Sequence, residues 1–387
     1  MKKLFCITLF FGCLLASGQS ALYNSGGLQV HDQGQVGFHV DLINDNVFTT
    51  GESLVGFYGG FPLFVDGTVA PTFYDVEFFT AGDVILNVPV SVVNNANFVG
   101  GNVQTQVTDP SINLNFLQDA FFTGENDTSK VVGFAAVTDK ATFSFPVGDA
   151  EQLRSLLLES EGRNAFANCA YFFEDPNNPL TYDQQFDTDN RVRDIGQISA
   201  TEFWVLQGDV PSRITINWNA RSNLANLANT PEEIIVVGYN LSSNQWVVLG
   251  NAAFGGDITE GFITSDTFVP NNYGAITFGT VPLPTDTFPV NNPSLGNYFL
   301  SPNGDGINDF LVIDGLEESP NNVLIIYNRL GQKVFERTNY VNEFNGFANT
   351  DNFVISRDTG LEEGIYYYIV TLNDLNLEYQ GFLFLDR

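Results

Sequence analysis

The residues best suited to chemistry lie in the loop Asn303-Gly-Asp-Gly-Ile-Asn-Asp309, where oxygen-bearing side chains alternate with glycines. A hard cation such as Ca²⁺ takes several oxygen ligands at about 2.3–2.6 Å, and glycine lets a loop curl around the ion. The candidate calcium ligands are Asn303, Asp305, Asn308 and Asp309. The glutamate at the twelfth position of an EF-hand is absent, and these residue types also favour a turn whose carboxylates accept backbone hydrogen bonds. Both interpretations stay open, and calcium is the one cofactor that the sequence suggests.

A second acidic group comprises Glu174, Asp175, Asp183, Asp187 and Asp189. Paired carboxylates can bind calcium or provide the acid and base of glycoside hydrolysis. The prolines among them favour an exposed acidic loop instead. Two histidines, His31 and His39, lack the further ligands that a zinc site requires, so we expect surface or structural roles for both.

No pattern for nucleophilic or phosphate chemistry is present. The chain has no Gly-x-Ser-x-Gly elbow and no Gly-Lys-Ser/Thr phosphate loop. Cys169 is the one cysteine outside the first 18 residues, and we expect it to be buried rather than reactive. Trp204, Trp218 and Trp246 could form a sugar-stacking platform, although tryptophans of this kind more often fill the core of a β-sandwich. The sequence therefore predicts no catalytic residues and a protein that is not an enzyme.

Composition and charge restrict the partners. The chain has 387 residues, with 15 Lys and Arg against 45 Asp and Glu, which gives a net charge of -30. Such a chain repels nucleic-acid phosphates and anionic membrane surfaces. The 36 Phe favour strands, and the 36 Gly, with many Asn and Asp, favour the turns between them. These properties predict a mainly β protein without a nucleic-acid partner.

The first 18 residues have the pattern of a signal peptide. Lys2 and Lys3 precede an apolar run, and small residues at 16–18 predict cleavage between Gly18 and Gln19. No other segment has the length of apolar sequence that a transmembrane helix needs. We therefore expect a secreted or cell-surface protein without a transmembrane span.

A proline-rich stretch divides the remaining chain. Residues 281–296 hold four prolines, which give a semi-rigid extended spacer. Before it, the sequence predicts a strand-rich half at residues 19–150 and a β-sandwich half at residues 151–280; after it, a compact domain occupies residues 297–387.

Two local patterns bear on the region before the spacer. The tripeptide Val-Gly-Phe begins at Val36, Val55 and Val132, and the first two copies are 19 residues apart. This spacing fits two coils of a β-solenoid, or an ordinary β pattern. Residues 149–159 predict a helix, because Asp149 can cap it and leucines at 153, 156 and 157 form a short apolar stripe.

The C-terminal domain reads as a small sandwich. Strands are expected at residues 322–327, 333–337, 364–372 and 377–385, with Gly331 in a left-handed turn position. The strand at 364–372 is apolar on both faces, which predicts a central position. About seven strands in this length fit an immunoglobulin-like sandwich.

The same domain resembles a known family. The segments SPNGDGINDFLVIDGL (301–316), IYNRLGQKVFERTNY (326–340), GIYYYIVTL (364–372) and the terminal GFLFLDR are similar, in order and spacing, to the gliding motility-associated C-terminal domain. That family is the type B sorting domain of the type IX secretion system of Bacteroidota. The resemblance covers residues 297–387 and implies that this domain engages the type IX machinery at the outer membrane.

Two functions compete for the region before the spacer. The first is a non-enzymatic surface protein, adhesin-like or associated with gliding, with surface polysaccharide or other surface proteins as partners. The second is a secreted carbohydrate-binding or carbohydrate-active protein. A hydrolase would place two carboxylates about 5–10 Å apart in a cleft beside exposed aromatics.

Overall fold

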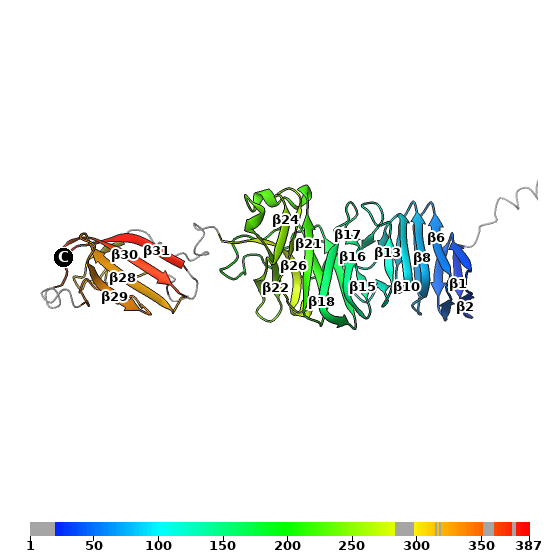
Figure 1. The fold of residues 1–387 in the computed structure, drawn as a ribbon, viewed down its shortest axis with the longest axis horizontal. Helices are drawn as coiled ribbons and strands as arrows, with labels where there is room; N and C mark the ends of the chain where they lie inside the picture. The colour runs from blue at the N-terminus through cyan, green and yellow to red at the C-terminus, as the bar shows by residue number, and fades with distance from the viewer. Residues whose placement is uncertain (1–19, 283–297, 314–315, 317–318, 351–359, 374–376) are drawn as a thin grey trace, which may run out of the picture. The chain divides into compact units, whose positions relative to one another are not determined.

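The computed structural model describes residues 20–282, 298–313, 316, 319–350, 360–373 and 377–387. It splits into two compact units, Met1–Pro282 and Leu283–Arg387; we call the described part of the first, residues 20–282, the passenger (Figure 1). The predicted signal peptide, its cleavage site and spacer residues 283–296 lie outside the described residues. Among the described residues, no helix is long and apolar enough to cross a membrane.

The first part of the passenger is a parallel β-solenoid. Along the chain, successive strands alternate between two parallel sheets. In the first two coils, one further strand per coil forms a small two-stranded sheet. The first sheet holds β1 (Ala21–Asn24), β4 (Asp41–Asn44), β7 (Leu63–Gly67), β9 (Val84–Leu86), β11 (Val103–Gln104), β14 (Val131–Val132) and β17 (Val147–Gly148). The second holds β3 (Gln35–Phe38), β6 (Leu54–Gly59), β8 (Thr72–Thr80), β10 (Val90–Gly100), β12 (Leu114–Phe116) and β15 (Ala135–Val137), with β13 (Phe121–Thr123) beside β10. The two-stranded sheet is β2 (Leu28–Val30) with β5 (Phe48–Thr50).

Two of the three Val-Gly-Phe copies mark successive coils of this solenoid, whereas the third begins at Val132 in β14, in the other sheet. The first two copies pair in register, with Val36 opposite Val55 and Phe38 opposite Phe57. The two phenylalanine rings stack at 5.3 Å, and the contact continues from Phe57 to Phe78 at 5.9 Å and to Phe98 at 5.7 Å. Equivalent positions of successive coils thus fill the core with one residue type, and the solenoid interpretation is confirmed.

The second sheet continues into an antiparallel β-sandwich. After β15 it adds β19 (Ala167–Phe172), β20 (Phe203–Gly208), β26 (Tyr273–Thr280), β22 (Ile234–Asn240) and β23 (Gln245–Gly250). With β13, the sheet then has twelve strands. A five-stranded antiparallel sheet contains β16 (Lys140–Phe145), β18 (Leu156–Asn164), β21 (Ser212–Trp218), β25 (Gly261–Thr264) and β24 (Ala253–Gly256). Four short 3₁₀ turns join these strands: η1 (Ala220–Ser222), η2 (Leu224–Asn226), η3 (Pro231–Glu233) and η4 (Pro270–Asn272).

The tryptophans lie in the cores of this sandwich. Trp204 and Trp218 contact the ring of Phe278 edge-on at 5.6 and 6.0 Å, and Trp246 packs in a second cluster with Phe186. All three are buried, as predicted. The twelve-stranded sheet and the largest core contain residues from both before and after residue 150. The domain boundary expected at residue 150 stays a prediction.

The predicted helix at residues 149–159 is wrong. Asp149 does accept two backbone N–H groups, from Glu151 and Gln152, but it closes a turn rather than a helix. The chain then enters strand β18, where Leu156 and Leu158 are buried between β16 and β21. The Leu-Leu-Leu-Glu run satisfies a period of two as well as a helical stripe, and pairing on both sides decides between them.

The described residues of the C-terminal unit form one sheet, whose inner face is covered. Its order is β27 (Tyr298–Leu300), β31 (Leu377–Leu385), β30 (Gly364–Leu372), β28 (Asn322–Asn328) and β29 (Lys333–Thr338). Strand β30 is central, as predicted, and Gly331 has the expected positive φ of 75°. Loop residues Leu311, Tyr340 and Phe344 cover the inner face. The described residues form five strands, and the seven-strand immunoglobulin-like arrangement stays a prediction.

Candidate functional site

The outer face of the C-terminal sheet presents aromatic side chains to solvent. Tyr327, Tyr367 and Phe382 are direct partners across β28, β30 and β31, so their side chains form one row. In the neighbouring row, Ile365 pairs with Phe384, whose ring stacks on Phe299 at 6.0 Å. We call these six residues the aromatic face.

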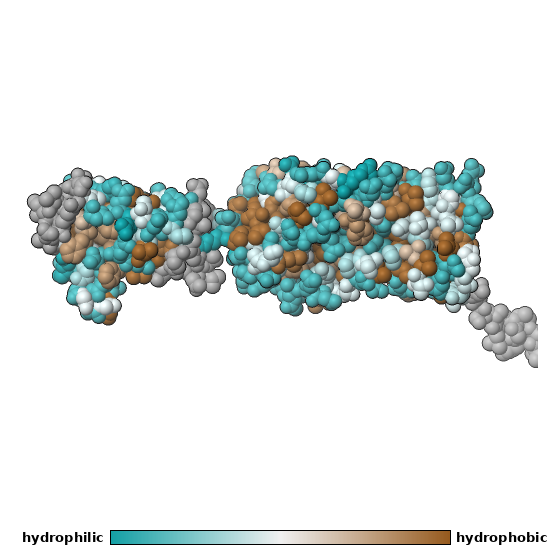
Figure 2. Space-filling model, turned by 90° about the horizontal axis from the view of Figure 1, so that it is seen from below, coloured by the Kyte–Doolittle hydropathy of each residue, from teal (hydrophilic) through white to brown (hydrophobic). Residues whose placement is uncertain are grey.

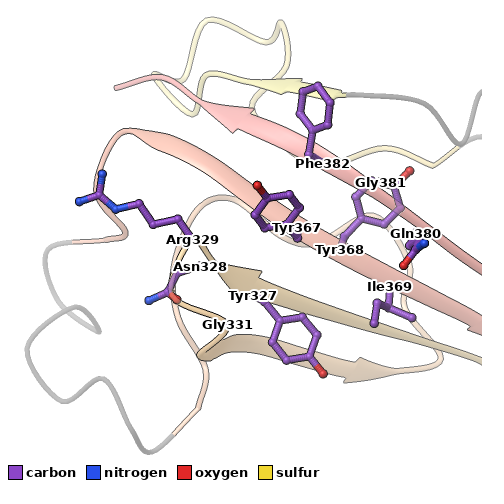
Figure 3. A pocket seen from close by; sticks show the side chains of 10 residues that line it. All are labelled: Tyr327, Asn328, Arg329, Gly331, Tyr367, Tyr368, Ile369, Gln380, Gly381 and Phe382. Carbon is purple, nitrogen blue, oxygen red and sulfur yellow. The ribbon is translucent and has the colours of Figure 1, made fainter.

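The aromatic face borders a shallow pocket of about 620 Å³. Figure 3 shows Tyr327, Tyr367 and Phe382 reaching it from three neighbouring strands. Tyr367 is 52% exposed and Phe382 is 38% exposed. Asn328, Arg329 and Gln380 add polar groups, and none of the lining residues is a carboxylate, histidine, serine or cysteine. The site is therefore suited to apolar and hydrogen-bonded recognition rather than to acid–base or nucleophilic chemistry.

The sequence predicted the central strand β30 but did not show that one of its faces is exposed to solvent. Gly364–Leu372 is apolar on both faces, which is typical of a strand covered on both sides. In the structure its inner residues, among them Tyr368 and Val370, are buried, whereas Ile365 and Tyr367 face solvent. The alternation of Phe382 and Phe384 with buried Leu383 and Leu385 in β31 was the available signal.

The predicted calcium loop is a network of turns. The two carboxylate oxygens of Asp309 accept the N–H groups of Gly304 and Gly306 at 2.7 and 2.8 Å. Asp305 accepts the N–H of Ile307 at 2.8 Å and the side-chain amide of Asn303 at 3.0 Å. These bonds lower the pKa of Asp305 and keep it ionised.

The four candidate ligands meet the expected turn geometry. Gly304, Gly306 and Asn308 all have positive φ, and the carbonyl of Asn308 accepts the N–H of Ser301 at 2.9 Å. Asn303, Asp305 and Asp309 take part in these turns through their side chains, whereas Asn308 takes part through its backbone carbonyl. A pocket of about 260 Å³ lies beside the loop. The turn interpretation accounts for these contacts, and calcium binding stays a prediction.

Calcium binding can be tested by replacing both carboxylates. If the loop binds Ca²⁺, calcium should raise the Tm of the C-terminal unit in the parent protein, because a ligand of the folded state stabilises it. The double variant Asp305→Ala, Asp309→Ala should lose this calcium-dependent shift. Asp257→Ala is a matched control, since Asp257 also accepts turn N–H groups but lies in the passenger. Equal shifts in the parent and double variant, or no shift in either, would assign the loop to a turn alone.

Glu174, Asp175 and Asp187 of the second acidic group accept hydrogen bonds within local turns. Glu174 accepts the N–H groups of Leu180 and Thr181, and Asp187 accepts the N–H of Asp189. Within the part of the chain that the structure describes, no group of three or more His, Cys, Asp or Glu is arranged to hold a metal. These contacts support the exposed-loop interpretation.

The remaining candidate residues are the two histidines and Cys169. His31 and His39 are exposed, and the His39 ring lies 5.7 Å from that of Tyr58. Cys169 is fully buried, as expected, and burial raises the pKa of its thiol well above the ordinary value. A raised pKa suppresses the reactive thiolate.

A buried ion pair escaped sequence reasoning. Arg154 Nη2 lies 2.7 Å from Glu202 Oε2, and both side chains are almost completely buried. Tyr171 donates its hydroxyl to the same carboxylate oxygen at 2.7 Å, and Arg154 also donates to Ser222 Oγ at 2.8 Å. Arg154 belongs to the segment assigned to a helix, and 48 residues separate it from Glu202, so no local pattern links them.

The comparisons with known proteins concern the C-terminal unit. Residues 294–385 match the family described as the CHU_C Type IX secretion signal domain. No curated protein and no solved structure matches the chain. The match includes every strand of the C-terminal sheet and implies a secreted or cell-surface protein that interacts with the type IX secretion machinery. The C-terminal unit is the type IX secretion sorting domain that its sequence motifs predicted.

Proposed function

We propose that the chain is a non-enzymatic surface protein whose aromatic face is recognised during type IX export. The face is an exposed apolar surface on a folded sorting domain, with partners set in register across four strands. Exposed apolar area of this kind gains about 25 cal/mol per Å² when a partner covers it. This arrangement is the observation that carries the proposal.

The passenger supports a role in attachment rather than catalysis. Its solenoid and sandwich form a scaffold of regular strands, and the passenger carboxylates Glu174 and Asp187 accept hydrogen bonds within turns. Hydrophilic residues and small hydrophobic patches are mixed over the face that Figure 2 shows. We propose an adhesin-like or gliding-associated passenger that contacts surface polysaccharide or other surface proteins.

The triple variant Tyr327→Ser, Tyr367→Ser, Phe382→Ser tests the aromatic face. We expect export to fall at least about tenfold, because the variant removes three apolar contacts from the recognised surface. The measurement is the fraction of protein in the medium and on the cell surface, against the fraction retained in the periplasm.

The control for this experiment removes exposed apolar residues elsewhere on the same unit. Ile307 and Val341 are 67% and 73% exposed and lie outside the aromatic face. The double variant Ile307→Ser, Val341→Ser should be exported normally. Normal export of a folded triple variant would exclude the aromatic face as the recognition surface.

A further inference from the structure

A second groove, of about 510 Å³, lies in the passenger on the twelve-stranded sheet. It crosses the point where the parallel strands of the solenoid give way to the antiparallel strands of the sandwich, between β15 and β19. The groove is far in sequence from the sorting domain, and export does not account for it.

The floor of the groove is built by strand register. Five residues are successive partners across β10, β12, β15, β19 and β20, and they form a single row: Ser91, Asn115, Ala136, Asn168 and Gln207. Their side chains lie on the face away from the solenoid core, because the alternate residues Leu114, Phe116 and Cys169 belong to that core. The small side chain of Ala136 separates Ser91 and Asn115 from the amide pair Asn168 and Gln207.

The amides of the row differ in their hydrogen bonding. Asn115 is bonded within the sheet, because its Nδ2 donates to Thr138 Oγ1 at 3.0 Å and to Ser91 Oγ at 3.5 Å, and its Oδ1 accepts from Thr138 Oγ1 at 3.1 Å. Asn168 donates to Gln207 Oε1 at 3.0 Å. Asn168 is only 1% exposed, yet its Oδ1 accepts no hydrogen bond. An unsatisfied buried carbonyl costs about 1–3 kcal/mol. Asn168 lines the groove, so a hydroxyl donor that reached its Oδ1 would remove this cost.

The walls of the groove are apolar and uncharged. Phe166, in the bend between β18 and β19, is 43% exposed and lines the groove together with Pro89, Pro110 and Ala70. No lining residue carries a charge at neutral pH. The groove therefore lacks the groups that would hold a phosphate, a carboxylate or a metal ion, and the chain's net charge of -30 disfavours polyanions further.

We propose that this groove binds a neutral saccharide. A pyranose ring presents a C–H face that can stack on Phe166 and hydroxyls that can donate to the side-chain oxygens of Asn115 and Asn168, each of which has a lone pair to spare. The combination of a few placed amides with one exposed aromatic matches that chemistry. The inference deepens the proposed attachment role, because it names the class of ligand that the displayed passenger would contact.

Affinity electrophoresis of the purified full chain tests the site and is independent of export. The gels contain one soluble polysaccharide each: the neutral polymers β-glucan, xylan and mannan, and the polyanions alginate and polygalacturonate. We expect at least one neutral polymer to retard the protein and neither polyanion to do so. Phe166→Ala and Asn115→Ala should each weaken the retardation about tenfold, which corresponds to about 1.4 kcal/mol.

The matched control is Phe121→Ala. Phe121 is 47% exposed and lies on the same sheet in β13, outside the groove. Its variant should be retarded like the parent. The proposal is overturned if no neutral polymer retards the protein, if only polyanions do, or if Phe166→Ala binds as the parent does. Each result leaves the export proposal untouched, since secretion is measured separately in cells.

Discussion

A chain that lacks residues 297–387 is expected to accumulate in the periplasm instead of reaching the medium or the cell surface. The deletion removes nearly the whole segment, residues 294–385, that matches the type IX secretion signal domain. The predicted signal peptide remains and should still direct the first transport step. The effect should be near-complete, because the deletion removes the sorting domain as a whole.

Fractionation of cells with antibodies to the passenger measures this result. The described cores of the passenger draw on residues 30–278, and that of the sorting domain on residues 300–385. The truncated passenger should therefore stay folded, which its thermal melt can verify. Arrival of the truncated protein in the medium at parental levels would disprove the role of the C-terminal unit in export.

Replacement of Glu202 by alanine is expected to destabilise the passenger by about 3–5 kcal/mol. The change leaves the Arg154 guanidinium buried without its carboxylate, and it also removes the acceptor of the Tyr171 hydroxyl. Trp204, Trp218 and Trp246 are the only tryptophans of the chain and all lie in the passenger. Denaturant unfolding followed by tryptophan fluorescence therefore reports on this unit alone.

Two further variants distinguish the cost of leaving one buried charge unpaired from the net contribution of the ion pair to stability. Arg163 and Asp139 form an exposed pair at 3.2 Å. Asp139 has a positive φ of 57°, which asparagine also tolerates, so Asp139→Asn should cost only about 0–1 kcal/mol. The double change Arg154→Met, Glu202→Leu removes both charges and should recover much of the stability. A loss of stability in Glu202→Ala no larger than that in Asp139→Asn would show that the buried pair does not stabilise this core.

Sequence patterns predicted the features that repeat or alternate locally. The spacing of the first two Val-Gly-Phe copies suggested stacked coils, because these two copies occupy the same place in successive turns of the solenoid. The sorting domain was predicted from several motifs in a fixed order. The Leu-rich segment after Asp149 was misassigned because two periodicities fit so few residues, and only the neighbouring strands determine which is adopted.

Features made by long-range register could not be predicted. The groove joins Ser91 to Gln207 through four successive strand pairings, and no single segment between them carries an unusual pattern. The partners Arg154 and Glu202 are likewise brought together by the sandwich. The open side of the C-terminal sheet was hidden for another reason: its exposed strand is as apolar as a fully covered one.

The change from parallel to antiparallel pairing at β15 also explains how the solenoid ends. A bare last coil would expose a row of unpaired backbone N–H and C=O groups, a template for edge-to-edge association. Here the antiparallel partner β19 takes up that edge, since Ala135–Val137 pairs with residues 167–169. The sandwich therefore acts as a built-in cap, and a fragment cut before β19 would lose the protection that keeps the coils from pairing with another chain.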